Sequence, residues 1–257
     1  MPKFEGRFVW YELMTTDTEA AQAFYGKVVG WGAQNAPVLG VSYTLFTVAE
    51  MPVAGLMQQP EEVRKRGAPP SWLGYVGVAN VDTAAAKVAR LGGTVHVPPS
   101  DIPNVGRFAV VLDPQHVAFA LFQPAGDEPD RPVDPSAPGR VGWHELATND
   151  WPKAFSFYNE LFSWQKGDAV DIGAMGTYQL FTVGGQAMGG MFNKPPAVPA
   201  PFWLYYVNVG DIDAAAQRVT AGGGKIINGP MQVPGGSWIL QSLDPQDAMF
   251  ALVGRKG

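Results

Sequence analysis

The chain has 257 residues, of which 46% are hydrophobic and 16% charged, and its formal net charge is −5 at pH 7. This composition is typical of a globular protein with a full core and excludes a disordered chain. The acidic balance argues against binding of nucleic acid, since no basic run is longer than Arg64-Lys65-Arg66. The chain has no cysteine, which excludes disulfides, thiolate metal ligands and cysteine nucleophiles.

Targeting segments are also absent from the sequence pattern. The amino terminus lacks the apolar run of a signal peptide, and no stretch approaches the roughly 20 apolar residues of a membrane span. We therefore expect a cytoplasmic protein that does not bind membranes.

Two successive patterns of one strand, one helix and further strands fill the first half of the chain. A strand is predicted at 8–14, followed by a helix at 18–28 with Asp17 or Thr18 as its N-cap. The pattern continues with strands at 42–48 and 54–58, a strand at 72–78, a helix at 83–91 and strands at 108–112 and 117–122. The first half therefore reads as two β-α-β-β-β modules.

The second half repeats the first. Motifs recur in the same order: Trp10-Tyr11-Glu12-Leu13 as Trp143-His144-Glu145-Leu146, Phe24-Tyr25 as Phe157-Tyr158, and Asp113-Pro114-Gln115 as Asp244-Pro245-Gln246. The third module starts at Trp143 and the fourth at Trp203, with a helix at 214–221. The chain is thus an internal duplication with four modules.

A proline-rich segment between Gln123 and Arg140 separates the two copies. We predict one domain at 1–125, an extended linker at 126–139 and a second domain at 140–257. Sheets this short need a partner that covers them. The predicted fold class is therefore α+β, with two tandem domains whose sheets curve around a cavity as incomplete barrels.

Taken together, these motifs resemble the glyoxalase/bleomycin resistance/extradiol dioxygenase (vicinal oxygen chelate) superfamily. The resemblance is carried by Phe24-Tyr25 and Phe157-Tyr158, by Gly30-Trp31 with Ser163-Trp164 in the copy, and by Asp113 and Asp244 in the last hairpins. It extends from about Gly6 to Val253. More narrowly, the chain resembles two-domain, glyoxalase-related bacterial proteins that are labelled hydroxylases. The resemblance implies paired β-α-β-β-β modules around a ligand cavity.

The resemblance also implies where a metal would bind. Metal-using members take their ligands from the opening strands of the modules and from the closing strand of each domain. This sequence carries other residues there: Trp10, Leu73 and Ala120 in the first domain, and Trp143, Leu204 and Ala251 in the second. None of these side chains offers a lone pair to a divalent cation. We therefore predict no metal, and no other cofactor, because no flavin or nicotinamide fingerprint appears.

The histidines do not replace the missing ligands. His96 and His116 fall in predicted loop or turn positions, and His144 follows Trp143 by one residue, so it points to the opposite face of its strand. We expect all three to be surface or structural residues.

Strand alternation predicts which side chains face the cavities. The predicted ligand-binding residues are Trp10, Tyr43, Leu73, Tyr75 and Phe122 in the first domain, and Trp143, Tyr178, Leu204 and Tyr206 in the second. Such apolar and aromatic surroundings are typical of a site for a small apolar or aromatic ligand.

Each predicted cavity also holds one carboxylate, Glu12 or Glu145. Desolvation among aromatic rings should raise its pKa, which suits a general acid or base. The alternative is structural, with each glutamate accepting a hydrogen bond from a tyrosine such as Tyr43 or Tyr178.

The sequence favours a metal-free protein that binds an unidentified small molecule. The alternative is a metal-independent isomerase or lyase that uses Glu12 and Glu145 as general acid and base. A metal-dependent lyase, a hydroxylase or dioxygenase and a purely structural partner protein are less favoured. The two halves could pair within a monomer or in a homodimer.

Overall fold

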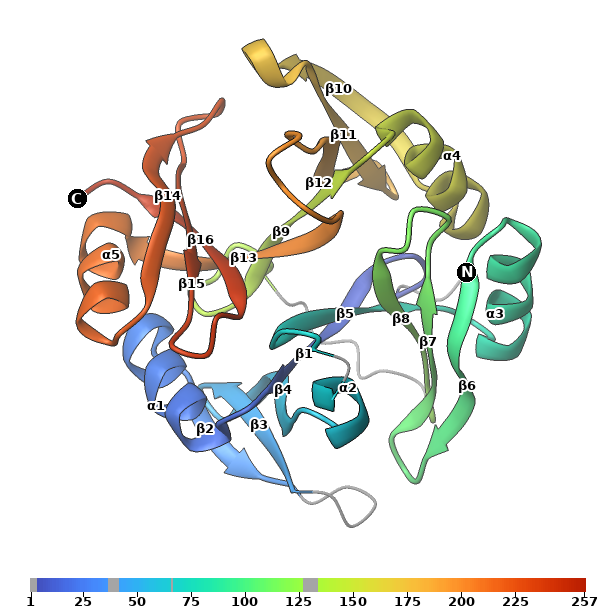
Figure 1. Ribbon diagram of the computed structural model, residues 1–257, viewed down its shortest axis with the longest axis horizontal. Helices are drawn as coiled ribbons and strands as arrows, with labels where there is room; N and C mark the ends of the chain where they lie inside the picture. The colour runs from blue at the N-terminus through green and yellow to red at the C-terminus, as the bar shows by residue number, and fades with distance from the viewer. Residues whose placement is uncertain (1–3, 37–41, 66, 127–133) are drawn as a thin grey trace. The chain divides into compact units, whose positions relative to one another are not determined.

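The computed structural model describes residues 4–36, 42–65, 67–126 and 134–257 (Figure 1). Four β-α-β-β-β modules follow one another along the chain, as predicted. Half of the predicted linker, including Pro129 and Pro132, lies outside the described residues.

The first half contains the first two modules. Its elements are β1 (Phe8–Thr15), α1 (Thr18–Val29), β2 (Gly32–Asn35), β3 (Tyr43–Val48), β4 (Met51–Gln58), α2 (Glu61–Lys65), β5 (Ser71–Gly77), α3 (Val81–Arg90), β6 (Thr94–Ile102), β7 (Gly106–Leu112) and β8 (Ala118–Pro124). The sequence analysis missed β2, whose residues are all exposed and show no alternation, and the short helix α2.

The second half repeats this order. Its elements are β9 (Val141–Thr148), α4 (Trp151–Phe162), β10 (Gln165–Asp171), a 3-10 turn (Gly173–Met175), β11 (Thr177–Val183), β12 (Gln186–Asn193), β13 (Phe202–Asp211), α5 (Ile212–Ala221), β14 (Lys225–Gln232), β15 (Trp238–Leu243) and β16 (Met249–Arg255). The sequence pattern does not locate the strands that directly follow α1, α3, α4 and α5, which are β2, β6, β10 and β14.

The helices α1 and α4 begin directly after an aspartate that caps their first turn. The Asp17 carboxylate accepts a hydrogen bond from the backbone N–H of Ala20 at 3.0 Å, and Asp150 accepts one from Lys153 at 3.1 Å. Each bond satisfies a backbone donor that has no partner within the helix. The prediction of Asp17 as an N-cap is confirmed.

Hydrogen bonds order the strands into two eight-stranded sheets, β2-β3-β4-β1-β5-β8-β7-β6 and β10-β11-β12-β9-β13-β16-β15-β14. Among the described residues neither order closes on itself, so β2 and β6 are edges of one sheet and β10 and β14 of the other. Within the modules, β1 pairs in parallel with β4, and β5 with β8. The predicted α+β fold, with four modules in two tandem open sheets, is confirmed.

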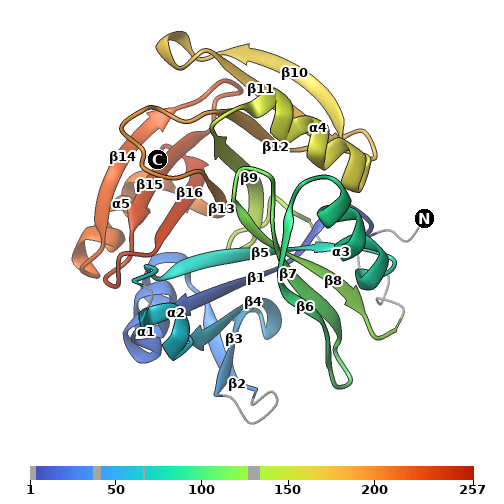
Figure 2. The same ribbon diagram turned by 45° about the vertical axis from the view of Figure 1, so that its right-hand side comes forward.

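Tertiary contacts divide the chain into two compact units, each of which takes one module from each half. Unit 1 comprises Met1–Val9, Leu73–Arg131 and His144–Trp203, and unit 2 comprises Trp10–Trp72, Pro132–Trp143 and Leu204–Gly257. In unit 2, α1 contacts α5, and the Arg218 guanidinium donates to the Val28 carbonyl at 3.0 Å. In unit 1, α3 contacts α4, and these helices lie alongside β6 and β12 respectively (Figures 1 and 2).

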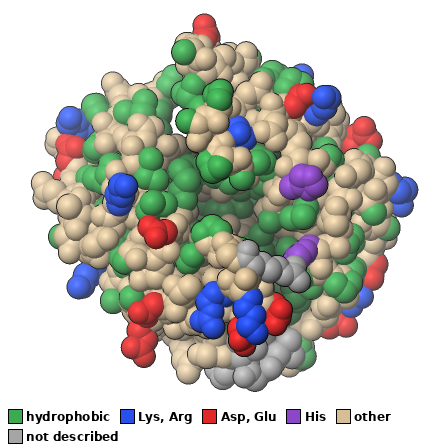
Figure 3. All heavy atoms as spheres, viewed as in Figure 1, with side chains coloured by type: hydrophobic (Ala, Val, Ile, Leu, Met, Phe, Trp, Pro, Cys, Tyr) green, Lys and Arg blue, Asp and Glu red, His purple; other side chains and the backbone are tan. Residues whose placement is uncertain are grey.

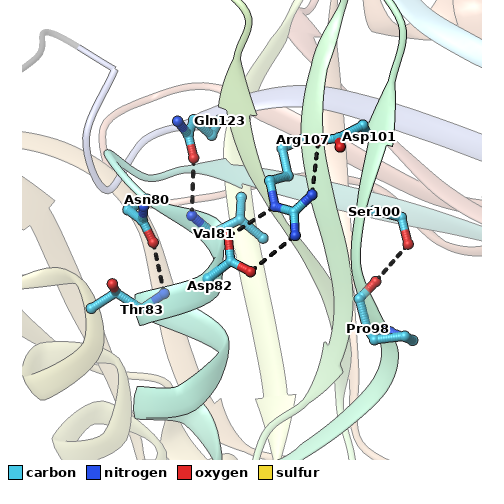
Figure 4. A network of polar contacts seen from close by, with 9 residues as sticks. All are labelled: Asn80, Val81, Asp82, Thr83, Pro98, Ser100, Asp101, Arg107 and Gln123. Atoms are coloured by element: carbon cyan, nitrogen blue, oxygen red, sulfur yellow. Dashed lines mark hydrogen bonds and ion pairs between the residues drawn. The ribbon is translucent and has the colours of Figure 1, made fainter.

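An arginine on β7 joins the start of α3 to the β6–β7 hairpin in unit 1 (Figure 4). Arg107 donates two hydrogen bonds to Asp82, at 2.8 and 2.9 Å, and one to Asp101 at 2.8 Å. The hydrogen bonds from Arg107 lower the pKa of Asp82 below its ordinary value. All three groups are solvent-accessible, so we expect this ion pair to fix the hairpin locally and to add little stability.

Surface charges also pair on α2. Lys65 Nζ lies 3.0 Å from Glu61 and 3.9 Å from Glu62, and basic and acidic side chains lie next to one another there (Figure 3).

Among the described helices, none is long and apolar enough to cross a membrane.

Candidate functional site

A buried carboxylate on β1 accepts a hydrogen bond from a tyrosine, which in turn accepts one from a tryptophan. Tyr43 Oη donates to Glu12 Oε2 at 2.8 Å, and Trp10 Nε1 donates to Tyr43 Oη at 3.1 Å. Trp10 and Glu12 share one face of the strand because they are two residues apart. Glu12 is only 8% exposed. The structure therefore brings together three of the predicted site residues, two on β1 and Tyr43 on β3.

The tyrosine in this group keeps its proton. Burial, and then the nearby Glu12 carboxylate, raise the pKa of Tyr43 far above its ordinary value. Tyr43 therefore stays protonated near neutral pH and can donate its hydrogen bond to Glu12.

The second half carries the same tyrosine–glutamate pair, in unit 1. Tyr178 Oη donates to Glu145 Oε2 at 3.1 Å, and the ring of Tyr178 packs beside Phe192 with a centroid separation of 5.8 Å. The hydrogen bond that the sequence analysis gave as the structural alternative is thus present for both glutamates. Their role as general acid and base stays a prediction.

Glycines make room for these tyrosines. Gly55 on β4 is the register partner of Glu12, and Gly190 on β12 is the register partner of Glu145. A Cβ atom on Gly55 would overlap the Tyr43 hydroxyl, and one on Gly190 would overlap the Tyr178 ring. Each ring crosses its glycine to reach the carboxylate. The sequence analysis missed this role, although glycine occurs at the matching position of both copies.

We expect Gly55→Ala to lower the free energy of unfolding by about 1–3 kcal/mol, because the new methyl group must displace the Tyr43 ring and break its bond to Glu12. Urea unfolding measures the change. Gly210→Ala is the control, since no atom lies within 4 Å of a Cβ at that position. Equal losses in the two variants would contradict the packing role of Gly55.

The other predicted binding residues form two further groups. In unit 1, Leu73 and Tyr75 are buried on β5, and the Tyr75 ring lies 6.4 Å, centroid to centroid, from Phe122 on β8. In unit 2, Leu204 and Tyr206 are buried on β13. Half-buried Trp143 completes the predicted set. That these groups and the glutamates line common cavities stays a prediction.

The positions at which the resemblance implies metal ligands do not fit a metal. Trp10 is engaged as a donor to Tyr43, and an indole nitrogen has no lone pair to give. Leu73 and Ala120 are buried and apolar, as are Leu204 and Ala251. Among the described residues, no group of three or more His, Cys, Asp or Glu side chains is placed to hold a metal ion. That the chain works without a metal stays a prediction.

The histidines occupy other kinds of position. His116 lies in the turn between β7 and β8 with φ +68°, as expected. The loop prediction for His96 is wrong, because this residue is exposed on the edge strand β6. His144 is buried: its Nδ1 lies 2.7 Å from the Met188 carbonyl oxygen, and its ring stacks on Phe8 at 4.3 Å. The expected structural role of His144 fits these contacts.

Two buried hydrogen-bond chains, which the sequence analysis missed, connect the halves. In unit 2, Trp72 Nε1 donates to Tyr25 Oη at 3.0 Å, and Tyr25 Oη donates to Asp244 Oδ2 at 3.1 Å. In unit 1, Trp203 and Tyr158 repeat this arrangement with Asp113, both bonds being 3.1 Å long. The Phe-Tyr and Asp-Pro-Gln motifs were recognised separately, but no local pattern shows that the tyrosine of one half pairs with the aspartate of the other.

Comparison with known proteins identifies the family. The family model described as the Glyoxalase/Bleomycin resistance protein/Dioxygenase superfamily matches residues 7–121 and 140–252. The chain is 32% identical to "Putative glyoxylase CFP32" of Mycobacterium tuberculosis, over 95% of this chain and 93% of that protein. It is 28% identical to "Anthracycline biosynthesis protein DauV" of Streptomyces sp. strain C5, over 96% and 93%.

Solved structures share the fold. The Mn(II)-bound glyoxalase from Novosphingobium aromaticivorans matches with a TM-score of 0.69 at 15% identity, covering 98% of this chain and 83% of that one. The 2,3-dioxygenase LapB from Pseudomonas sp. KL28 matches with a TM-score of 0.68 at 10% identity, covering 98% and 92%. Because the family model matches both copies of the duplication, the chain belongs to the Glyoxalase/Bleomycin resistance protein/Dioxygenase superfamily.

Proposed function

We propose that this chain binds a small apolar or aromatic organic molecule without using a metal ion. The observation that carries the proposal is the hydrogen-bonded group of Trp10, Tyr43 and Glu12. Aromatic surfaces with one oriented polar group are typical of binding sites for small organic molecules. A carboxylate has about four acceptor positions, so Glu12 can accept a ligand O–H or N–H in addition to the Tyr43 hydroxyl.

The residues at the implied ligand positions support the metal-free part of the proposal. Those positions carry indole, isobutyl and methyl side chains instead of metal-ligating groups. Such side chains offer a ligand apolar contact area and cannot coordinate a metal ion. Relatives that are named anthracycline biosynthesis proteins suggest polycyclic aromatic compounds as the first ligands to test.

We expect doxorubicin, a fluorescent anthracycline, to bind saturably in a fluorescence titration of the intact chain. Trp10→Ala should weaken binding at the first half about tenfold or more, because it removes a large aromatic contact and the donor to Tyr43. Trp238→Ala is the control, since Lys256 lies over the Trp238 ring, 4.4 Å from its centroid, and no site role is assigned to it.

Two other results would contradict the proposal. The first is the absence of saturable binding of doxorubicin and of simpler aromatic probes. The second is the tight retention of about one equivalent of manganese, iron, nickel or zinc per half after metal loading, measured by elemental analysis. A chemical change in a bound probe that is lost in the Glu12→Gln, Glu145→Gln double variant would instead favour the metal-independent enzyme.

A further inference from the structure

Three neighbouring strands present a matched row of residues in each half. In unit 1, Tyr75 on β5 is the register partner of Ala120 on β8, which is the partner of Val110 on β7. In unit 2 the equivalent row is Tyr206 on β13, Ala251 on β16 and Gln241 on β15. The two rows thus differ at one position, where valine in the first half corresponds to glutamine in the second.

Both rows lie on the sheet face opposite the helices. Their sequence neighbours on β7, Ala109 and Val111, are fully buried, and α3 contacts that strand. The corresponding neighbours on β15, Leu240 and Ser242, are fully buried where α5 contacts the strand. Because side chains alternate along a strand, the rows face away from the helices, on the side predicted to form the cavities.

Gln241 is held in a defined orientation. Its Nε2 donates to Tyr206 Oη at 2.7 Å, and its Oε1 accepts from Asn228 Nδ2 at 3.3 Å. The second half therefore presents an amide and a phenol joined by a hydrogen bond. In the first half, the isopropyl group of Val110 holds the position that corresponds to Gln241.

The next register pair on β7 and β8 also differs in side-chain type from the corresponding pair on β15 and β16. Phe108 and Phe122 are register partners in the first half, and Ile239 and Val253 hold the equivalent positions in the second. Phe122 also packs against Tyr75 with an interplanar angle of 77°. At these positions the first half carries phenylalanine and valine, whereas the second half carries aliphatic groups and a glutamine that bonds Tyr206.

We propose that the two halves bind different classes of ligand, and that Val110 and Gln241 determine the difference. The second half takes a molecule whose hydroxyl or carbonyl group bonds the Gln241–Tyr206 pair. The first half, with an isopropyl group at that position, also takes an aromatic ring that lacks such a group. This inference rests on the proposed function and adds the chemical class for each half.

The asymmetry follows from the cost of leaving polar groups without partners. A site that contains an oriented amide and phenol rejects a ligand that covers them without hydrogen bonds, because both groups then lose water. An isopropyl group at the same position distinguishes only weakly between a ligand with a hydroxyl and one without.

Two isosteric probes separate these behaviours: 2-naphthol, and 2-methylnaphthalene, which has a methyl group in place of the hydroxyl. By equilibrium dialysis, we expect the intact chain to bind about two equivalents of 2-naphthol and about one of 2-methylnaphthalene, with the second half at least about tenfold weaker for the latter. Gln241→Val, which copies the first half, should raise 2-methylnaphthalene binding to about two equivalents. Val110→Gln should instead reduce it.

Gln241→Leu, which is closer to glutamine in volume, repeats the test if Gln241→Val does not fold, as judged by circular dichroism. Equal stoichiometry for both probes in the unmodified chain, or no change in the Gln241 variants, would overturn the inference and leave the proposed function in place. Failure of both probes to bind the unmodified chain would overturn the inference, and failure of doxorubicin as well would overturn the proposed function with it.

Discussion

Acidification from pH 6.5 to pH 4 is expected to destabilise the folded chain by about 3 kcal/mol through the single residue His144. Burial lowers the pKa of His144 from 6.5 to about 4, and its bond to the Met188 carbonyl offsets this only in part. Between these pH values the unfolded chain binds a proton that the folded chain does not. Stability therefore falls as the pH falls through this window, and the loss is complete below the folded pKa.

The measurement is the free energy of unfolding in urea at several pH values between 4 and 7. His144→Phe, which keeps an aromatic ring against Phe8, should remove most of the slope. His96→Phe on the exposed strand β6 should keep it. A slope that persists in His144→Phe would show that the acid sensitivity has another origin.

Two buried carboxyl groups change the stability with pH in the opposite direction from His144. Burial raises the pKa of Asp113 and of Asp244 above the ordinary value in spite of their hydrogen bonds. The stability that they contribute is present at low pH and is lost as the pH rises through their folded pKa. Comparison of His144→Phe with the unmodified chain at each pH cancels this contribution.

The second large effect concerns the hydrogen-bond chain that connects the halves in unit 2. We expect Asp244→Asn to lower the free energy of unfolding by about 2 kcal/mol. The Asp244 carboxylate accepts from the backbone N–H groups of Gln246 and Ala248 and from the Tyr25 hydroxyl, which in turn accepts from Trp72. An asparagine amide must turn an N–H toward one of these donors, so at least one buried donor loses its acceptor.

Asp247→Asn is a matched control for Asp244→Asn. Asp247 is exposed in the same turn with φ +67°, a conformation that asparagine tolerates well. We expect this control to change stability by less than about 0.5 kcal/mol. Asp113→Asn, which affects Tyr158 in unit 1, should cost about as much as Asp244→Asn. Equal effects of Asp244→Asn and Asp247→Asn in urea would contradict the role of the buried carboxylate.

Local chemistry explains which parts of the fold were predictable. The helix that starts after Asp17 was located because the capping residue precedes a periodic apolar pattern. The internal repeat then transferred each assignment to the second copy. Edge strands such as β2 and β10 were missed because solvent on both faces removes the alternation that marks a strand.

The candidate site was predictable to the extent that it depends on alternation along one strand. Alternation along the strand places Trp10 and Glu12 on one face. The bond from Tyr43 to Glu12, which the structural alternative predicts, is present. The orientation of Gln241 depends on register across β13, β16 and β15. The pairing of Tyr25 with Asp244 joins opposite ends of the chain. No sequence window contains that information.

The composition of the two units also bears on how the duplicated copies can evolve. Each unit takes one module from each copy. A substitution at Tyr25 in the first copy changes the surroundings of Asp244 in the second, so the two positions constrain each other. We therefore expect the copies to diverge less at such paired interior positions than on the faces away from the helices, where Val110 and Gln241 differ.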